Sequence, residues 1–362
     1  MPIEVESPEE YGYENIAYNL SESSVTDQTL ESLDLRIPNL KLLYNEHRGN
    51  SSLRQLIVAE TTLDKDDVLV TGGAAGALYI VATSQLSKGD HLVVVRPNYA
   101  TNLETPRAIG CEISFIDLDF DSGFQLDPSS ISAALRPNTK LVSITCPHNP
   151  SGTLLSRAAL DDIVHITRQH PCLLLVDETY RDITYKSPLP NAATLADHVV
   201  SVSSLSKSYG IPGIRLGWLI TKNKRLQQTF LAAKEQISIS GSVIDEWIAE
   251  QVLSRKAEIL PSRVAEMRKR LKIVEDWIKR EEMVEWVEPQ GGVVCFPRLK
   301  AEPLGGMQAF YNRLLEKYKT YVGPGHWFEM PARYFRIGYG WPSIEELQKG
   351  LETISMALRD NE

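Results

Sequence analysis

The chain has 362 residues, of which 43% are hydrophobic and 23% charged, so it can bury a large core and is long enough for two domains, or one large domain with a smaller annex. Its formal net charge is -9 and it holds no dense run of Lys or Arg, which excludes a nucleic-acid partner, because binding a phosphate backbone needs a basic face. No stretch approaches the roughly 20 apolar residues that cross a bilayer, so we expect no membrane partner.

The first residues and the cysteines indicate a compartment. The stretch MPIEVESPEEYGYE is acidic and lacks the apolar run of a signal peptide. The four cysteines are widely scattered: Cys111, Cys146, Cys172 and Cys295. Three of them lie in apolar runs, which favours buried free thiols in a reducing compartment over a disulfide framework or a zinc site. We therefore expect a cytoplasmic protein without a metal centre.

Between residues 66 and 221, short apolar runs alternate with longer amphipathic ones. The runs that predict strands are 67–73, 91–97, 111–118, 140–146, 172–177, 198–204 and 215–221. Amphipathic stretches such as 76–86 and 157–170 lie between them and predict helices. Because the runs are continuously apolar, they indicate strands buried on both faces. The fold class is therefore α/β, with a largely parallel sheet between helices.

The remainder of the chain predicts a smaller α+β part. Residues 223–282 are helical in pattern and end in a long charged stretch that can bridge two domains. Strands are expected at 291–299 and 334–340, and a final helix at 343–360 begins with a capping box of Ser343 and Glu346. We expect residues 1–40 to pack on this part, which gives a large domain of 41–265 and a small domain of 1–40 plus 266–362.

Polar residues follow several of the predicted strands. The stretch VTGGAAGALY at 70–79 joins a strand to a helix through small residues, so its N–H groups can face an anion, although taken alone a packing turn explains it better. Tyr99 and Asn149 stand just after two other strands, where a core tyrosine and an Asn-Pro turn are the ordinary explanations. Asp177 ends a very apolar strand and needs a cationic partner unless it only caps a helix; Tyr180 can reach the same crevice.

The stretch SSLSKSYGIPGIRLGW at 203–218 places Lys207 among serines and returns Arg215 eight residues later. Pyridoxal phosphate (PLP) is held as a Schiff base by a lysine near an anion-binding loop, together with a carboxylate at a strand end and an aromatic face, and the sequence offers all of these groups. The serines and the arginine would then grip the phosphate.

At this point the motifs resemble a family. In order along the chain, they are YNEHRGNSSLR, GGAAGAL, RPNY, PHNPSG, VDETY, SLSKSYGIPGIRLGW, PQGGVVCF, VGPGHWFE and FRIGYG. Their combination is similar to the class I and II aminotransferases, which are fold-type-I PLP enzymes, over essentially the full length of the chain. The resemblance implies the fold-type-I architecture and PLP as the cofactor.

The resemblance also implies roles for residues around the cofactor. Lys207 would be the Schiff-base lysine, Asp177 would pair with the pyridine nitrogen, and Tyr99 would stack on the ring. Asn149 and Tyr180 would hydrogen-bond the phenolic oxygen of the ring. The residues expected around the phosphate are Gly73, Ala74, Ala75, Ser204, Ser206 and Arg215. Ala75 departs from the family, which usually has Thr or Ser there, so we expect a weaker grip on the phosphate.

Two further residues resemble family positions outside the cofactor ring. Tyr44 resembles the tyrosine that reaches the phosphate in a neighbouring subunit, which implies a homodimer with shared active sites. Arg336 resembles the arginine that binds the α-carboxylate of the substrate, and a guanidinium suits that role because it donates two parallel N–H bonds. An ionised Asp177 would keep the pyridine nitrogen protonated, and the freed amine of Lys207 would move a proton between Cα and C4′ of the cofactor.

The sequence leaves three functions open, two of them enzymatic. Transfer of an amino group between an amino acid and a 2-oxo acid is the leading hypothesis. A diverted reaction, such as cyclisation, oxidation or elimination, can use the same fold. The stretch YNLSESSVTD resembles arginine-modifying members such as the capreomycidine synthases, so Glu22 and Asp27 could receive a cationic side chain, or be two solvated acids. A ligand-sensing regulator would need an attached DNA-binding domain, and the family pattern leaves no basic helical extension for one.

Overall fold

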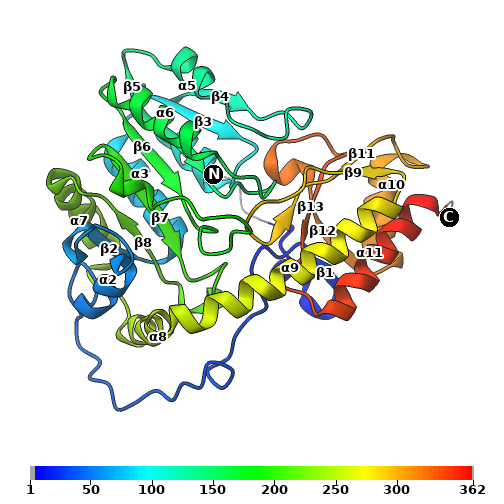
Figure 1. Cartoon of the computed structure of the whole chain (residues 1–362), viewed down its shortest axis with the longest axis horizontal. Coiled ribbons are helices and arrows are strands. Elements are labelled where there is room, and N and C mark those ends of the chain that lie inside the picture. Colours follow the sequence, from blue (N-terminus) through cyan, green and yellow to red (C-terminus); the bar gives the residue numbers. More distant parts are fainter. Residues whose placement is uncertain (1–4, 361–362) are drawn as a thin grey trace.

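The computed structural model describes residues 5–360, and its larger part is built on a seven-stranded sheet in the order β2-β8-β7-β6-β5-β3-β4 (Figure 1). The strands are β2 (Val68–Thr71), β3 (His91–Arg96), β4 (Glu112–Asp117), β5 (Thr139–Thr145), β6 (Leu173–Asp177), β7 (Val199–Ser204) and β8 (Gly217–Ile220). Strands β3 to β7 pair in parallel, and β8 is antiparallel to both of its neighbours. The prediction of an α/β fold with a largely parallel sheet is confirmed.

Helices cover both faces of this sheet, as the continuously apolar strands predict. The helices of the larger part are α2 (Ser51–Val58), α3 (Gly73–Gln85), α4 (Thr101–Ile109), α5 (Pro128–Ala134), α6 (Arg157–Arg168), α7 (Lys224–Ser238) and α8 (Val243–Ser254). Leu92 and Val94 pack with residues of α3, α4 and α7, whereas Val93 and Val95 pack with residues of α5 and α6. Alternate side chains of β3 therefore enter two different hydrophobic clusters, because successive residues of a strand point to opposite faces.

The second part is a four-stranded sheet in the order β1-β12-β13-β10. Its strands are β1 (Tyr18–Leu20), β10 (Val294–Cys295), β12 (Thr320–Pro324) and β13 (Phe335–Gly338). The helices beside it are α9 (Lys256–Arg280), α10 (Gly306–Asn312) and α11 (Ile344–Arg359), and a short α1 (Pro8–Tyr11) precedes β1. Helix α9 runs from the larger part to this one (Figure 1). Tyr18–Leu20 pairs with β12, so part of the N-terminal segment packs where the sequence predicts; the domain boundaries stay a prediction.

The stretch 291–299 differs from the single strand expected there. It forms two short strands, β10 and β11 (Arg298–Leu299), which belong to different sheets: β10 pairs with β13, and β11 pairs with β9 (Val284–Glu285). Pro297 stands between them and has no N–H to donate, so a continuous ladder cannot cross it.

The C-terminal helix and the thiols follow the sequence prediction. The Ser343 hydroxyl accepts from Glu346 N at 3.1 Å, and the Glu346 carboxylate accepts from Ser343 N at 2.7 Å, which completes the capping box. All four cysteines are free thiols, and three of them are buried. Within residues 5–360, no helix is both long and apolar enough to pass through a membrane.

Candidate active site

The site lies at the edge where the parallel strands of the large sheet end. Tyr99 follows β3, Asn149 follows β5, Asp177 is the last residue of β6, and Lys207 follows β7. Because β3, β5, β6 and β7 are adjacent and parallel, their carboxyl ends meet at one edge. The strand order thus brings to one edge residues that are up to 108 positions apart, from 99 to 207.

Lys207 is held by the N-terminal segment rather than by its own strand. Its Nζ donates to Ser23 Oγ at 2.9 Å, and its carbonyl accepts from Val25 N at 3.0 Å. Burial lowers the pKa of the Lys207 ammonium first of all, and the positive charge of Arg336 lowers it further. A neutral amine with a free lone pair is therefore more accessible than on an ordinary surface lysine.

Asp177 is a buried carboxylate that keeps one side open. Both of its side-chain hydrogen bonds go to Oδ1, from Thr179 N at 3.0 Å and from Thr179 Oγ1 at 2.6 Å. Burial raises the pKa of this carboxyl, and the bonds from Thr179 only partly offset the shift. In the described part of the chain, no Lys, Arg or His lies within ion-pair distance of Asp177. The carboxylate is therefore suited to a cationic group supplied by a ligand.

The glycine-rich turn and Arg215 come together at the start of α3. Gly73 has φ of +75°, a conformation that favours glycine, and a Cβ added there would lie 2.8 Å from Arg215 Nη2, so the turn and the guanidinium are in close contact. Helix α3 has no side chain that caps its N-terminus, and its first N–H groups are left for another acceptor. A guanidinium beside uncapped N–H groups is an arrangement that suits a phosphate.

Arg336 in β13 reaches into the same region from the smaller part. Its Nη2 donates to the Ser21 carbonyl at 2.7 Å and its Nη1 donates to Asn149 Oδ1 at 3.3 Å. The guanidinium also lies over the ring of Phe328, 5.1 Å from its centroid. Arg336 thereby joins the N-terminal segment, the loop after β5 and the small sheet in one buried site.

Comparison with known proteins identifies the family. The model of the family "Aminotransferase class I and II" matches residues 24–354. The chain belongs to the aminotransferase class I and II family. Capreomycidine synthase of Streptomyces vinaceus is 28% identical over 86% of this chain and 79% of that protein. Arginine–pyruvate transaminase of Pseudomonas aeruginosa is 27% identical over 82% of this chain and 77% of that protein.

A solved structure matches the fold over almost the whole chain. The PLP-dependent aminotransferase of Streptococcus suis has a TM-score of 0.89 and 26% sequence identity, and covers 96% of this chain and 95% of its own. The sequence prediction of a fold-type-I PLP architecture is confirmed. The protein is an enzyme of the PLP-dependent aminotransferase type.

Acidic and aromatic side chains gather beside Lys207 and Arg336 in this aminotransferase fold. Tyr13 Oη donates to Glu22 Oε1 at 3.0 Å, and Trp341 Nε1 donates to Asp27 Oδ2 at 2.8 Å. The rings of Tyr13 and Trp341 stack with centroids 6.0 Å apart. Burial raises the pKa of Glu22, while the charges of Lys207 and Arg336 and the bond from Tyr13 oppose that rise. Glu22 is thus a half-buried, hydrogen-bonded acid near Lys207 and Arg336, whereas Asp27 is an exposed acid bonded to Trp341.

Two of the predicted tyrosines stand apart from these contacts. Tyr99 is 41% exposed after β3, and its N–H donates to Asn98 Oδ1 at 2.7 Å. Tyr44 is 77% exposed on the segment before α2, and no hydrogen bond or ring contact within residues 5–360 joins it to the other predicted residues.

The other predicted residues near Lys207 are buried. The hydroxyl of buried Tyr180 donates to the Ser23 carbonyl at 2.7 Å. Ser204 ends β7 and Ser206 directly precedes Lys207; both are buried, and Ser206 N donates to Ser204 Oγ at 3.4 Å.

Two histidines, His148 and His326, have structural contacts. His148 is buried, with Nδ1 2.7 Å from Ser151 Oγ and Nε2 2.8 Å from the Pro97 carbonyl. Burial lowers its pKa to about 4, so it is neutral at pH 7. His326 pairs at the surface with Glu6. Both rings are occupied by contacts within the protein.

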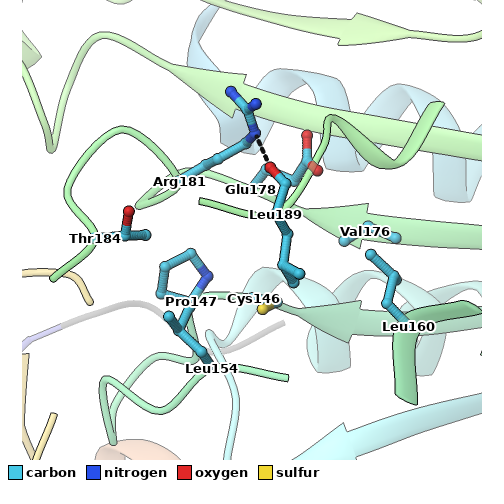
Figure 2. Close-up of a pocket in the computed structure, with 9 residues that line it drawn as sticks. All are labelled: Cys146, Pro147, Leu154, Leu160, Val176, Glu178, Arg181, Thr184 and Leu189. Atoms are coloured by element: carbon cyan, nitrogen blue, oxygen red, sulfur yellow. Dashed lines mark hydrogen bonds between the residues drawn. The ribbon is translucent and has the colours of Figure 1, made fainter. Parts of the chain in front are cut away.

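A small cavity behind the strand ends is separate from the site. It is lined by Cys146, Pro147, Leu154, Leu160, Val176, Glu178, Arg181, Thr184 and Leu189 (Figure 2). Arg181 Nε donates to the Leu189 carbonyl at 3.0 Å. Burial raises the pKa of Glu178 to about 7, and its carboxylate accepts from Asn191 Nδ2 and Ala192 N at 2.7 and 2.8 Å. Because its one acid is already bonded and none of the predicted cofactor residues lines it, the cavity is part of the packing.

Sequence reasoning missed Ser23, which contacts both Lys207 and Tyr180. A serine in a loop has no sequence pattern that marks it as part of a site. Its contacts arise only because the N-terminal segment packs against the turn after β7.

Proposed function

We propose that the protein transfers an amino group between an α-amino acid and a 2-oxo acid, with PLP as its cofactor. The observation that carries this proposal is a set of three ionisable groups that meet at one site. They are the half-buried Lys207 amine, the buried Asp177 carboxylate, which has no cationic partner within residues 5–360, and the buried Arg336 guanidinium from β13. These are the groups needed to attach an aldehyde, to balance a ring cation and to bind a carboxylate.

The residues present fit PLP. The open side of Asp177 suits the protonated ring nitrogen, and Arg215 with the N–H groups of 73–75 suits the phosphate, joined by Ser204 and Ser206. When bound, PLP supplies an aldehyde that links to amines and a ring that accepts electrons. We propose that Tyr99 packs against the ring, and that Asn149 and Tyr180 face its phenolic oxygen. For Tyr180 this role needs its hydroxyl proton to turn from the Ser23 carbonyl to that oxygen.

The protein groups then have distinct tasks. We propose that Arg336 binds the α-carboxylate and fixes the Cα–H bond relative to Lys207. The lowered pKa of Lys207 keeps its amine able to take the Cα proton and deliver it to C4′, the aldehyde carbon of the cofactor. Burial of Arg336 excludes water, which strengthens its attraction for a carboxylate.

The experiment for this proposal is reduction with borohydride and mass analysis of the peptide that contains residue 207. We expect the cofactor mass on Lys207, and no attachment in Lys207→Ala. Purified protein is then incubated with L-arginine and pyruvate, and alanine formation is followed. An unmodified Lys207 peptide, or full turnover by Lys207→Ala, would overturn the proposal.

A cationic amino acid is the substrate class that we propose. Glu22 lies near Lys207 and Arg336 and accepts from Tyr13, whose ring stacks on Trp341, and Trp341 in turn bonds the exposed Asp27, so a side-chain cation would meet an acid and aromatic faces. The capreomycidine synthase and the arginine–pyruvate transaminase among the relatives support this class by their names. Glu22→Gln should raise KM for L-arginine about tenfold, since a hydrogen bond to a charged group contributes ~1.5–3 kcal/mol. Exposed Glu14→Gln is the matched control, and an unchanged arginine KM in Glu22→Gln would reject the class.

A second candidate reaction is the cyclisation or oxidation of arginine, because capreomycidine synthase is one of the relatives. A cyclase or oxidase would convert L-arginine in the absence of a 2-oxo acid. The two reactions therefore separate by products: alanine formed from pyruvate indicates amino transfer, whereas a cyclised or oxygenated arginine derivative formed without pyruvate indicates the diverted reaction.

We also propose a homodimer that shares its active sites. Leu42, Leu43 and Tyr44 are 76%, 61% and 77% exposed on one segment, a large apolar surface for one short stretch. The next residues anchor this segment to α7, where His47 Nδ1 lies 2.6 Å from Glu235. Figure 1 shows the segment as a long extended trace before α2.

Sedimentation should give the mass of two chains, and Leu42→Ser combined with Leu43→Ser should give one. A wild-type monomer that is fully active would reject the dimer.

We also propose a location for the protein. The free thiols support a reducing compartment, and we propose the cytoplasm.

A further inference from the structure

Ser23 lies between two residues of the site that are far apart in sequence. Its hydroxyl accepts from Lys207 Nζ at 2.9 Å, across 184 positions, and its carbonyl accepts from Tyr180 Oη at 2.7 Å, across 157 positions. Ser23 is 7% exposed. Among the hydrogen bonds of residues 5–360, its hydroxyl has one partner, Lys207.

The backbone fixes the position of this hydroxyl independently of the side chain. Val25 N donates to the Lys207 carbonyl at 3.0 Å, and Gln28 N donates to the Gly210 carbonyl at 2.7 Å. Gly210 has φ of +65°, and a Cβ there would lie 2.4 Å from the Thr26 carbonyl, so the two segments are in close contact. The Ser23 hydroxyl is therefore presented to Lys207 by a rigid frame.

We propose that Ser23 is a positioning residue for the Lys207 amine during proton transfer at Cα, an inference that rests on the proposed function. The lysine side chain has four rotatable bonds, and an amine in the wrong rotamer cannot face the Cα–H bond. When the hydroxyl accepts one N–H of the neutral amine, it fixes the direction in which the single lone pair of Nζ points. Removal of the Cα proton breaks the C–H bond, leaves its electrons on the substrate and turns the amine into an ammonium.

The same hydrogen bond then stabilises the ammonium, because a bond from a charged donor is stronger than one from a neutral amine. Glu22 and Arg336 also act on this amine, with opposite signs, so Ser23 is the neutral group that holds it by direct contact. The proton leaves Nζ when it is delivered to C4′ of the cofactor or returned to Cα, and either step restores the starting state of the lysine.

The first test measures proton removal without depending on the later reaction. Holoenzyme is placed in D₂O with L-arginine, or with the common amino acid that the wild type converts fastest, and deuterium at Cα is followed by mass spectrometry. Ser23→Ala should slow exchange about tenfold, because a hydrogen bond to a charged group is lost, with little change in KM. The α-deuterium isotope effect on kcat should rise.

Two matched variants separate positioning from folding. Ser23→Thr keeps the hydroxyl and should restore most of the exchange rate. Ser24→Ala removes the adjacent buried hydroxyl, which makes no hydrogen bond in the described part of the chain, and should exchange like the wild type. Thermal unfolding of each variant reports whether the segment is intact, since Ser23→Ala keeps the carbonyl that binds Tyr180.

The second test does not use turnover. In cofactor-free protein, the labelling of Lys207 by acetic anhydride is measured against pH by peptide mass. Ser23→Ala should move the midpoint down by about half a pH unit, because the lost bond favours the ammonium.

An unchanged midpoint with an unchanged isotope effect, or an equal loss in Ser24→Ala, would overturn the role of Ser23. Absence of Cα exchange and cofactor attachment in the wild type would overturn the proposed function instead.

Discussion

Two buried carboxylates, one in each part of the molecule, differ in their hydrogen-bond partners and in the direction of their pKa shifts. Asp177 at the end of β6 receives bonds only from Thr179. Glu281, just after α9, receives Arg359 Nη1 and Nη2 at 2.8 Å each and Ser355 Oγ at 2.6 Å. Burial raises the pKa of both groups, but at Glu281 the bonds from Arg359 and Ser355 outweigh burial and lower it, whereas at Asp177 burial prevails.

The difference separates an acid that serves the fold from one that serves a ligand. Glu281 ties the C-terminal helix to the end of α9, and its charge is balanced within the chain. Asp177 is left with a costly buried charge, which a bound cation would relieve. Substitutions at the two acids should therefore have opposite consequences for stability and activity.

The largest effect is expected on the activity of Asp177→Asn. Without the carboxylate the ring nitrogen of the cofactor loses its counter-charge, and kcat should fall by on the order of a hundredfold or more. The same variant should unfold at a higher temperature in the cofactor-free form, because a buried charge is removed and the amide oxygen still accepts from Thr179. Steady-state kinetics and thermal unfolding measure both. Retained activity, or a clear loss of stability, would place Asp177 with Glu281 as a structural acid.

A smaller effect, on stability alone, is expected for Glu281→Ala. Breaking a buried pair leaves Arg359 without its partner, and because that arginine is half exposed we expect a loss of ~2 kcal/mol. The kcat of the folded variant should stay at the wild-type value. Exposed Glu282→Ala is the neighbouring control for both measurements, and a kcat loss confined to Glu281→Ala would contradict a purely structural role.

The smallest expected effect is the pH dependence of the unfolding temperature, which should differ in sign between variants of the two acids. The pKa of Glu281 is lowered from its ordinary value of 4.5, so its contribution is complete above that pH and disappears as the pH falls through the folded value. The gap in unfolding temperature between wild type and Glu281→Gln should thus close on acidification from pH 7 to below pH 4.5. The pKa of Asp177 is raised, so the advantage of Asp177→Asn should grow as the pH rises above 3.8. Parallel pH series on the two variants would contradict the comparison if their trends had the same sign.

The sequence by itself was sufficient for the large α/β sheet and for the order of the site motifs. Continuous apolar runs predict strands such as β3 and β6 because both of their faces are buried, and a polar residue at the end of such a run marks the edge of the sheet. The capping box at Ser343 is also local, since its bonds span three residues. These features depend on residues that are close in the sequence and can therefore be predicted from the sequence alone.

The tertiary structure decided what those residues contact. Pro297 divides a predicted strand between two sheets, and Ser23 meets Lys207 although 184 positions separate them. The balance of each buried acid likewise depends on which side chains the packing brings near it: Arg359 reaches Glu281, and no protein cation reaches Asp177 in the described chain. Contacts over such separations are set by how elements pack, because burial and long-range hydrogen bonds are properties of the assembled fold.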